Sequence, residues 1–192
     1  MSFKVILLGD TGVGKTSILL RKMDNSFSFQ MAPTVGASHL KSVIQIDGKN
    51  SVELKIWDTA GQEQFASLVP MYARNTDVCI IVASITDPAS IEHIETWKDR
   101  LFAAGEKPPI FYAINKIDLD YPDGNSGGEV QKLKDQLSQQ YQNLFFVSAK
   151  TGEEIEALFN SVAVEVYTQD ACANQIKKVN EPEQNTEKQC NC

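Results

Sequence analysis

The segment at residues 9–16 constrains the fold of this chain more than any other part of the sequence. Its sequence, GDTGVGKT, satisfies the pattern G-x-x-x-x-G-K-[ST] at every fixed position. A run of apolar residues at 3–8 comes directly before it, and a helical pattern begins at Lys15. Because a loop between a strand and a helix can point its backbone N–H groups inward, the motif predicts a ligand that carries phosphates.

The chemistry of this loop assigns roles to its last residues. We expect Lys15 to place its charge near the outer phosphates and Thr16 to offer its hydroxyl to Mg²⁺. The predicted phosphate-binding residues are Asp10, Thr11, Gly12, Val13, Gly14, Lys15, Thr16 and Ser17.

Apolar runs recur along the chain, and each is followed by a helix-type segment. They lie at residues 5–8, 78–83, 109–114 and 144–147. This alternation predicts a mostly parallel sheet. Strands expected at 42–46 and 52–57 flank the turn sequence DGKN, which is typical of a hairpin. We therefore predict an α/β fold, the P-loop NTPase three-layer sandwich, with six strands of which one is antiparallel. A single helix is expected between Asp87 and Gly105.

Length and charge limit the domain organisation. The 192 residues fit one domain, predicted at 1–170, while the polar stretch at 171–192 is expected to be a disordered tail. The net charge of −7 argues against a nucleic-acid-binding protein, because affinity for a phosphate backbone comes from surplus Lys and Arg. No run of eighteen apolar residues is present, so no membrane span is expected.

The sequence DTAGQE at residues 58–63 follows a predicted strand, so it should lie at the carboxyl edge of the sheet. There the carboxylate of Asp58 can serve Mg²⁺. Gly61 would let its backbone N–H approach a terminal phosphate, and Gln62 can orient an attacking water. This segment predicts hydrolysis of the phosphorylated ligand.

Two further polar segments follow strands at the same edge and are suited to reading a base. In Asn115-Lys116-Ile117-Asp118, the carboxylate of Asp118 can accept the two adjacent donors of guanine, whereas adenine would leave it poorly paired. The stem of Lys116 can cover one face of the base. Ser148-Ala149-Lys150, after the last strand, can present a backbone donor to the guanine oxygen. Together these segments predict GTP or GDP as the ligand.

The order of these motifs resembles the Ras superfamily of small GTPases over residues 3–168. The resemblance implies that Thr34 closes on Mg²⁺ only with GTP, so that Thr16, Thr34 and Asp58 form the metal site. It implies that Gln62, Lys15, Thr34 and Gly61 act in catalysis. It also implies that Phe27 packs edge-on against the base, with Phe29 as the competing candidate.

Within that superfamily, WDTAGQE at residues 57–63 and the final Cys190-Asn191-Cys192 resemble the Rab branch, and residues 34–38 and 67–72 resemble its early-endosomal subgroup. The resemblance implies prenylation of Cys190 and Cys192. It further implies a monomer acting in vesicle trafficking on the cytoplasmic face of an intracellular, early-endosomal membrane, in exchange with the cytosol. The expected partners are an exchange factor, an activating protein, effectors, and prenylation escort and dissociation-inhibitor proteins.

The effector surface implied by the resemblance departs from the Rab pattern at two positions. His39 stands where Rabs usually carry a Phe, and Ala73 stands where a Tyr is common. The effector residues carried over are Val35, Gly36, His39, Trp57 and Tyr72. His93 is expected to be a solvated helix residue.

Three alternatives to a GTP-hydrolysing Rab-like switch are compatible with the sequence. A β-branched side chain at Thr11 can crowd Gln62 and the attacking water, which predicts slow intrinsic hydrolysis and dependence on an activating protein. The same crowding leaves a GTP-binding scaffold without turnover as one alternative, and another branch of the superfamily as a second. A P-loop kinase or ATPase is a third, against which Asp118 argues.

Overall fold

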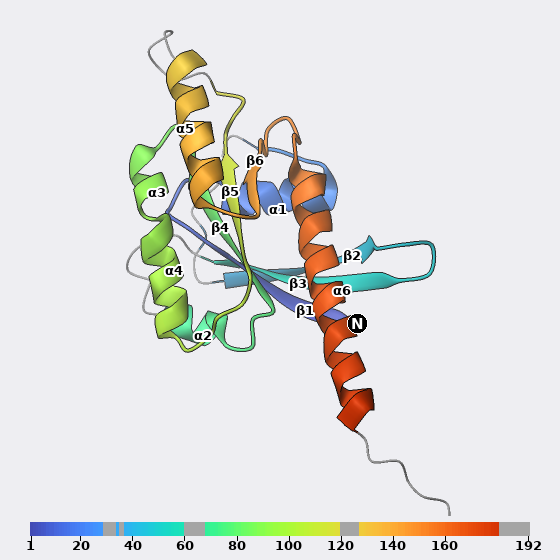
Figure 1. Cartoon of the computed structure of the whole chain (residues 1–192). Helices are drawn as coiled ribbons and strands as arrows, with labels where there is room; N and C mark the ends of the chain where they lie inside the picture. Colours follow the sequence, from blue (N-terminus) through green and yellow to red (C-terminus); the bar gives the residue numbers. More distant parts are fainter. Residues whose placement is uncertain (29–33, 35–36, 60–67, 120–126, 181–192) are drawn as a thin grey trace, which may run out of the picture.

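The structure is a computed structural model that describes residues 1–28, 34, 37–59, 68–119 and 127–180 (Figure 1). Within them a six-stranded sheet has the order β2-β3-β1-β4-β5-β6. The strands are β1 (Ser2–Leu8), β2 (Ala37–Gln45), β3 (Ser51–Thr59), β4 (Val78–Ser84), β5 (Ile110–Asn115) and β6 (Leu144–Phe146). The helices are α1 (Lys15–Asp24), α2 (Val69–Ala73), α3 (Pro88–Glu92), α4 (Ile94–Ala103), α5 (Gly127–Gln140) and α6 (Ile155–Asn180).

Every pair of neighbouring strands is parallel except β2 and β3, which are antiparallel. The turn between these two is closed by Asp47, whose Oδ1 accepts hydrogen bonds of 2.8 Å from the backbone N–H groups of Lys49 and Asn50. The predicted α/β sandwich, with six strands and one of them antiparallel, is therefore confirmed.

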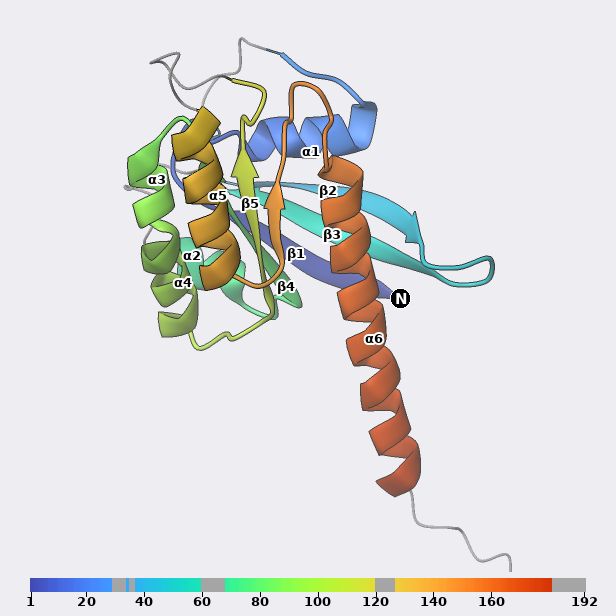
Figure 2. The ribbon, with the colours of Figure 1, turned by 45° about the horizontal axis from the view of Figure 1, so that its top comes forward.

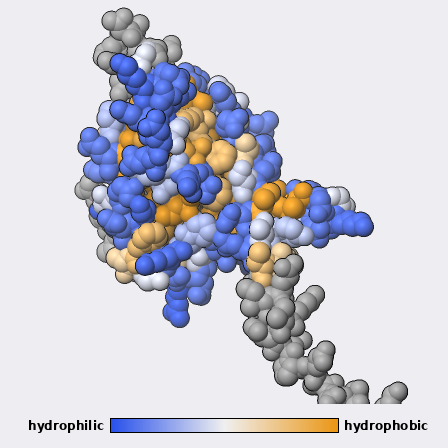
Figure 3. All heavy atoms as spheres, in the orientation of Figure 1, coloured by the Kyte–Doolittle hydropathy of each residue, from blue (hydrophilic) through white to orange (hydrophobic). Residues whose placement is uncertain are grey.

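Two hydrophobic cores lie on opposite faces of the sheet, and alternation along β1 explains the division. Val5 and Leu7 face α1 and α6, while Ile6 and Leu8 face α2, α4 and α5. Figure 2 shows α1 and α6 on one side and the other helices on the opposite side. Hydrophilic side chains cover most of α4 and α5 in the view of Figure 3, as expected for helices with one buried face.

The expected single helix between Asp87 and Gly105 is in fact two helices that meet at His93. The backbone of His93 has φ −77° and ψ −5°, but its N–H still donates to Ala89 and its carbonyl still accepts from Trp97. The chain bends here without losing these hydrogen bonds. From this position the side chain of His93 contacts Asp10.

The last helix also differs from the expectation. α6 continues to Asn180, past the predicted boundary at residue 170. Residues 171–180, ACANQIKKVN, contain several strong helix formers and neither Gly nor Pro, so nothing in them ends a helix. The first proline after the helix is Pro182, and residues 181–192 lie outside the described part of the chain. No helix in the described residues combines the length and apolar character needed to cross a membrane.

Candidate nucleotide-binding site

A cavity of about 420 Å³ lies at the carboxyl edge of the sheet. Figure 2 shows the loops after β1, β5 and β6 near the start of α1 at this edge. Most of the cavity lining consists of residues that the motifs single out. The lining residues are Thr11, Gly12, Gly14, Lys15, Thr16, Ser17, Phe27, Ser28, Thr34, Thr59, Asn115, Lys116, Asp118, Leu119, Ala149 and Lys150. Three predicted segments, far apart in the sequence, thus form one site.

Close packing explains two of the glycines in the phosphate loop. Gly9 has φ +138°, and a Cβ atom there would lie 2.1 Å from the carbonyl oxygen of Val82 on β4. Gly14 has φ +99°, and a Cβ atom there would lie 2.3 Å from Nδ2 of Asn115. Both positions require glycine, because any side chain would push the loop away from the sheet or from the segment after β5.

Lys15 is buried at the start of α1, 6% exposed. Its ammonium donates hydrogen bonds to two backbone carbonyls of the same loop, that of Gly9 at 2.8 Å and that of Asp10 at 2.7 Å. Burial lowers the pKa of Lys15 to about 8, against the opposing effect of Asp58 and Asp10. The site therefore holds a desolvated cation whose charge is incompletely balanced.

Three oxygen-bearing side chains lie together beside Lys15. The Thr16 hydroxyl donates to Oδ2 of Asp58 at 2.6 Å, and the Thr34 hydroxyl donates to the same atom at 3.4 Å. The two hydroxyls are 2.9 Å apart. Oδ1 of Asp58 is buried with no hydrogen-bond partner among the described residues, and burial raises the pKa of Asp58.

These three side chains fit a hard cation. An unpaired buried carboxylate oxygen costs free energy that a cation would recover, and hydroxyl and carboxylate oxygens are ligands that Mg²⁺ prefers. The described residues contain no group of three or more His, Cys, Asp or Glu side chains that could hold an ion without further ligands. The donor set is thus suited to an ion that also binds the oxygens of a phosphate group.

At the other end of the cavity, Asn115 connects all three loops. It is 1% exposed, its Nδ2 donates to the carbonyl of Val13 at 2.8 Å, and its Oδ1 accepts from the N–H of Ala149 at 3.1 Å. Its polar atoms are therefore engaged with the loops themselves. This side chain sets the spacing between the phosphate loop and the segment after β6.

Asp118 has two partners from the segment after β6. The Ser148 hydroxyl donates to Oδ1 at 2.5 Å, and Nζ of Lys150 lies 3.3 Å from Oδ2. Burial raises the pKa of Asp118, but the hydrogen bonds from Ser148 and Lys150 outweigh it, so the pKa lies below its ordinary value. Asp118 is therefore an ionised hydrogen-bond acceptor at neutral pH.

Arg21 is a supporting residue that the sequence motifs do not identify. Its Nε donates to the carbonyl of Ala149 at 2.8 Å, and a terminal nitrogen donates to the carbonyl of Lys150 at 2.5 Å. The other terminal nitrogen donates to Asn25. Arg21 is thus fixed behind the end of the cavity that Asp118 lines.

The aromatic residues named by the sequence occupy two places. Phe27 lines the cavity and packs against the core, whereas Phe29 lies outside the described residues. Away from the cavity, the rings of His39 and Trp57 stack at 5.3 Å, and those of Trp57 and Tyr72 are 6.5 Å apart. The remaining effector positions, Val35 and Gly36, are not among the described residues.

Several predicted residues do not line the cavity. Val13 and Ser148 are fully buried behind it, and Asp58 lies beneath Thr16. The carboxylate of Asp10 contacts His93 and Trp97. His93 is exposed, as expected for a solvated helix residue, but it also contacts Asp10. The predicted site residues that also fall outside the described part of the chain are Gly61, Gln62, Cys190 and Cys192. Ser28, Thr59 and Leu119 line the cavity without having been predicted.

The fold and the site define a nucleotide-binding protein of the P-loop class, because the loop motif at residues 9–16, the hydroxyls of Thr16 and Thr34 and the carboxylate of Asp118 meet at one cavity at the sheet edge. The chain matches the model of the Ras family over residues 4–168, and it belongs to that family. The predicted membership of the Ras superfamily is therefore confirmed.

Sequence similarity to curated relatives indicates which branch of the family this chain belongs to. The GTP-binding protein ypt5 of Schizosaccharomyces pombe is 39% identical over 170 residues, covering 87% of this chain and 79% of the relative. YPT53 of Saccharomyces cerevisiae is 36% identical, covering 97% of this chain and 80% of the relative. Rab-7b of Paramecium octaurelia is 35% identical, covering 88% of this chain and 82% of the relative. The relatives are Ypt/Rab GTPases, so the predicted Rab-type GTPase is confirmed.

Proposed function

We propose that this chain is a molecular switch of early-endosomal membranes that binds GTP with Mg²⁺, hydrolyses it slowly, and is reset by nucleotide exchange. The observation that supports this most directly is the cavity lined by Lys15, Thr16, Thr34 and Asp118. Asp58 lies beside it, where its carboxylate accepts hydrogen bonds from Thr16 and Thr34. One end of the cavity suits phosphates and the other suits a guanine base.

Guanine selection falls to Asp118, whose ionised carboxylate accepts the ring N–H and the exocyclic amine together. The stem of Lys116, which lines the same cavity, covers one face of the base, and Phe27 packs against it edge-on. The backbone of residues 148–150 supplies a donor to the guanine oxygen. Asn115 acts by holding these loops in register with the phosphate loop.

The phosphates are bound by the loop at residues 10–17, with the Lys15 ammonium at the outer phosphates. Thr16, Thr34 and Asp58 would hold Mg²⁺, which neutralises phosphate charge when bound. Thr34 comes from a separate segment, so its hydroxyl links the state of that segment to the γ-phosphate.

Hydrolysis requires Gln62 to orient the attacking water and the N–H of Gly61 to approach the γ-phosphate. Thr11 lines the cavity beside Gly12, where its β-branched side chain crowds the water. Arg21, held by Ala149 and Lys150, is not placed to act as an arginine finger. We therefore expect a slow intrinsic rate that an activating protein accelerates.

The effector surface of the proposed switch includes His39, Trp57 and Tyr72, together with Val35 and Gly36. Prenyl groups on Cys190 and Cys192 would supply the two anchors that stable membrane attachment needs, with escort and dissociation-inhibitor proteins carrying the lipidated chain. A Cys190→Ser/Cys192→Ser variant should lose membrane fractionation in cells. Unchanged fractionation would refute the lipid anchor.

Phosphate release from Mg²⁺-GTP by the purified chain tests the switch, with Gln62→Leu as the control and with direct binding of GTP, GDP and ATP. Slow, GTP-specific release that falls further in Gln62→Leu supports it. Tight GTP binding with no turnover above the Gln62→Leu background would favour a scaffold and would implicate Thr11. Equal binding of ATP would refute the assignment of Asp118.

A further inference from the structure

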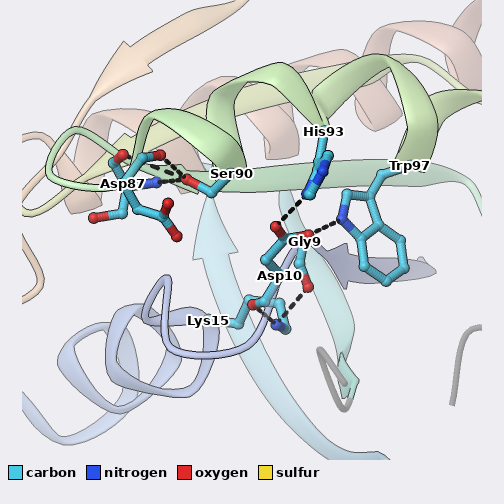
Figure 4. Close-up of polar contacts among 8 residues, drawn as sticks. Gly9, Asp10, Lys15, Asp87, Ser90, His93 and Trp97 are labelled. Carbon is cyan, nitrogen blue, oxygen red and sulfur yellow. Dashed lines mark hydrogen bonds and ion pairs between the residues drawn. The ribbon is translucent and has the colours of Figure 1, made fainter. Parts of the chain in front are cut away.

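The carboxylate of Asp10 turns away from the cavity and toward α4, although Asp10 belongs to the phosphate loop. Figure 4 shows it between Lys15 on one side and the helix residues on the other. Nε1 of Trp97 donates to Oδ1 at 2.7 Å, and Nδ1 of His93 lies 2.6 Å from Oδ2. Both oxygens of this carboxylate are thus bound by one helical face.

Trp97 is held in place by packing, whereas the side chain of His93 is 47% exposed. His93 and Trp97 are four residues apart, so they project from the same side of the helix. The ring of Trp97 is 3% exposed within the core, and the guanidinium of Arg100 lies over it at 4.7 Å. A side chain packed in this way keeps its N–H in a fixed direction, so Asp10 meets a rigid partner.

The backbone of Asp10 carries this constraint to Lys15. The same residue that binds α4 through its carboxylate offers its carbonyl to the Lys15 ammonium at 2.7 Å. The preceding carbonyl, that of Gly9, accepts the other hydrogen bond at 2.8 Å, and Gly9 packs directly against Val82. The loop that holds Lys15 is therefore fixed by β4 on one side and by α4 on the other.

We propose that Trp97 and His93 are positioning residues for phosphate binding, acting through Asp10 on the Lys15 ammonium. This inference depends on the proposed function, because it assumes that Lys15 binds the outer phosphates. If Asp10 loses its partners, its peptide unit can rotate and one acceptor of the buried ammonium moves. Lys15 then loses the geometry that suits a phosphate, and nucleotide should leave faster.

Nucleotide release from the full chain tests the proposal, with GDP that carries a fluorescent ribose label as the probe. Trp97→Phe keeps an aromatic ring but removes the N–H, and His93→Leu removes the other donor. Each should accelerate GDP release about tenfold, as expected for the loss of a hydrogen bond to a charged group. His93→Gln, which keeps a neutral donor, should restore a rate within about twofold of the wild type.

A double-mutant cycle separates positioning from a loss of packing. In an Asp10→Ala background, Trp97→Phe should have no further effect on release. Affinity for GMP, which lacks the outer phosphates, should be unchanged in Trp97→Phe while affinity for GDP falls. Phe102→Leu is the matched control, because Phe102 is a half-buried aromatic residue of α4 that packs on the same core. It should lower Tm without changing GDP release.

Wild-type release rates in Trp97→Phe and His93→Leu would overturn the positioning role and leave nucleotide binding intact. Equal acceleration by Trp97→Phe with and without Asp10 would also overturn it, since the effect would then come from packing. Failure of the wild-type chain itself to bind GDP would refute the proposed function as well.

Discussion

In the proposed function the cavity has a base end around Asp118 and a phosphate end around Lys15, and these differ in how their polar groups are paired. At the base end, Asp118 binds Ser148 and Lys150, and the polar atoms of Asn115 bind the neighbouring loops. At the phosphate end, burial lowers the pKa of Lys15 and raises that of Asp58, and one oxygen of that carboxylate has no partner in the described residues.

The difference in pairing suggests that base specificity and nucleotide affinity come from different ends of the cavity. The base end is a preformed set of hydrogen-bonding groups, so it should reject a base whose donors do not match the carboxylate of Asp118. The phosphate end contains desolvated charges of both signs whose balance would be completed by an anion and a cation. We therefore expect binding free energy to come mainly from the phosphate end, and discrimination between bases from the other.

The largest effect should follow from Asp118→Asn, which tests the base end. An amide cannot accept the two guanine donors, because one of its two polar atoms is itself a donor. GDP affinity should fall by about 10⁴-fold, as for a site that loses a designed hydrogen-bond match. Competition against labelled GDP measures this, with ATP as the second competitor.

Asp99→Asn is the matched control for that change, because Asp99 is an exposed residue of α4 outside the cavity lining. Its GDP affinity should equal that of the wild type. A fall of less than tenfold in Asp118→Asn would break the comparison, since the phosphate end would then supply the selectivity as well.

Much of this architecture could be predicted from the sequence because each motif directly follows an apolar strand. Strands that pair in parallel end at one edge, so residues 9–16, Asp58 and residues 115–118 had to meet there. The hairpin at residues 47–50 likewise fixed the one antiparallel pair. These inferences needed only local patterns and the rules of sheet connection.

The remaining features depend on tertiary contacts that no local pattern encodes. Arg21 supports Ala149 and Lys150 from more than a hundred positions away in the sequence, and only the packing of α1 beside the last loop brings them together. Asp10 was assigned to the nucleotide because it lies in the loop motif. Its carboxylate contacts His93 and Trp97, which the loop motif does not reveal.

A second, smaller effect should appear in the pH dependence of GDP binding, which tests the phosphate end. Phosphates favour the charged form of Lys15, so they raise its pKa above the value of about 8 in the free protein. Binding then takes up a proton wherever free Lys15 is neutral. GDP affinity should therefore fall about tenfold between pH 7 and pH 9, measured by fluorescence titration.

Lys15→Arg provides the control for that titration. A guanidinium stays protonated throughout this range, so the variant should lose the slope that Lys15 contributes, whatever its absolute affinity. Titration of the guanine ring would act equally on both proteins. Identical slopes in the two proteins would show that the Lys15 charge is already balanced, and the contrast between the two ends would be lost.

The smallest effect concerns Asp58, and it has opposite signs for stability and for binding. An acid with a raised pKa in the folded state stabilises the fold at low pH, and that contribution is lost as pH rises through the folded pKa. At pH 7 the nucleotide-free wild type thus contains a carboxylate that burial disfavours. Asp58→Asn should raise its stability by about 1 kcal/mol, or roughly 2–4 °C in Tm.

Calorimetry of protein stripped of nucleotide and Mg²⁺ measures that gain, which should shrink toward acid pH as Asp58 becomes protonated. The same substitution should weaken Mg²⁺-dependent GTP binding, because the neutral amide would offer the ion no charge. Asp99→Asn should change neither quantity. A loss of stability in Asp58→Asn at pH 7 would mean that Thr16 and Thr34 already compensate the buried charge, so that both ends of the cavity are complete without a ligand.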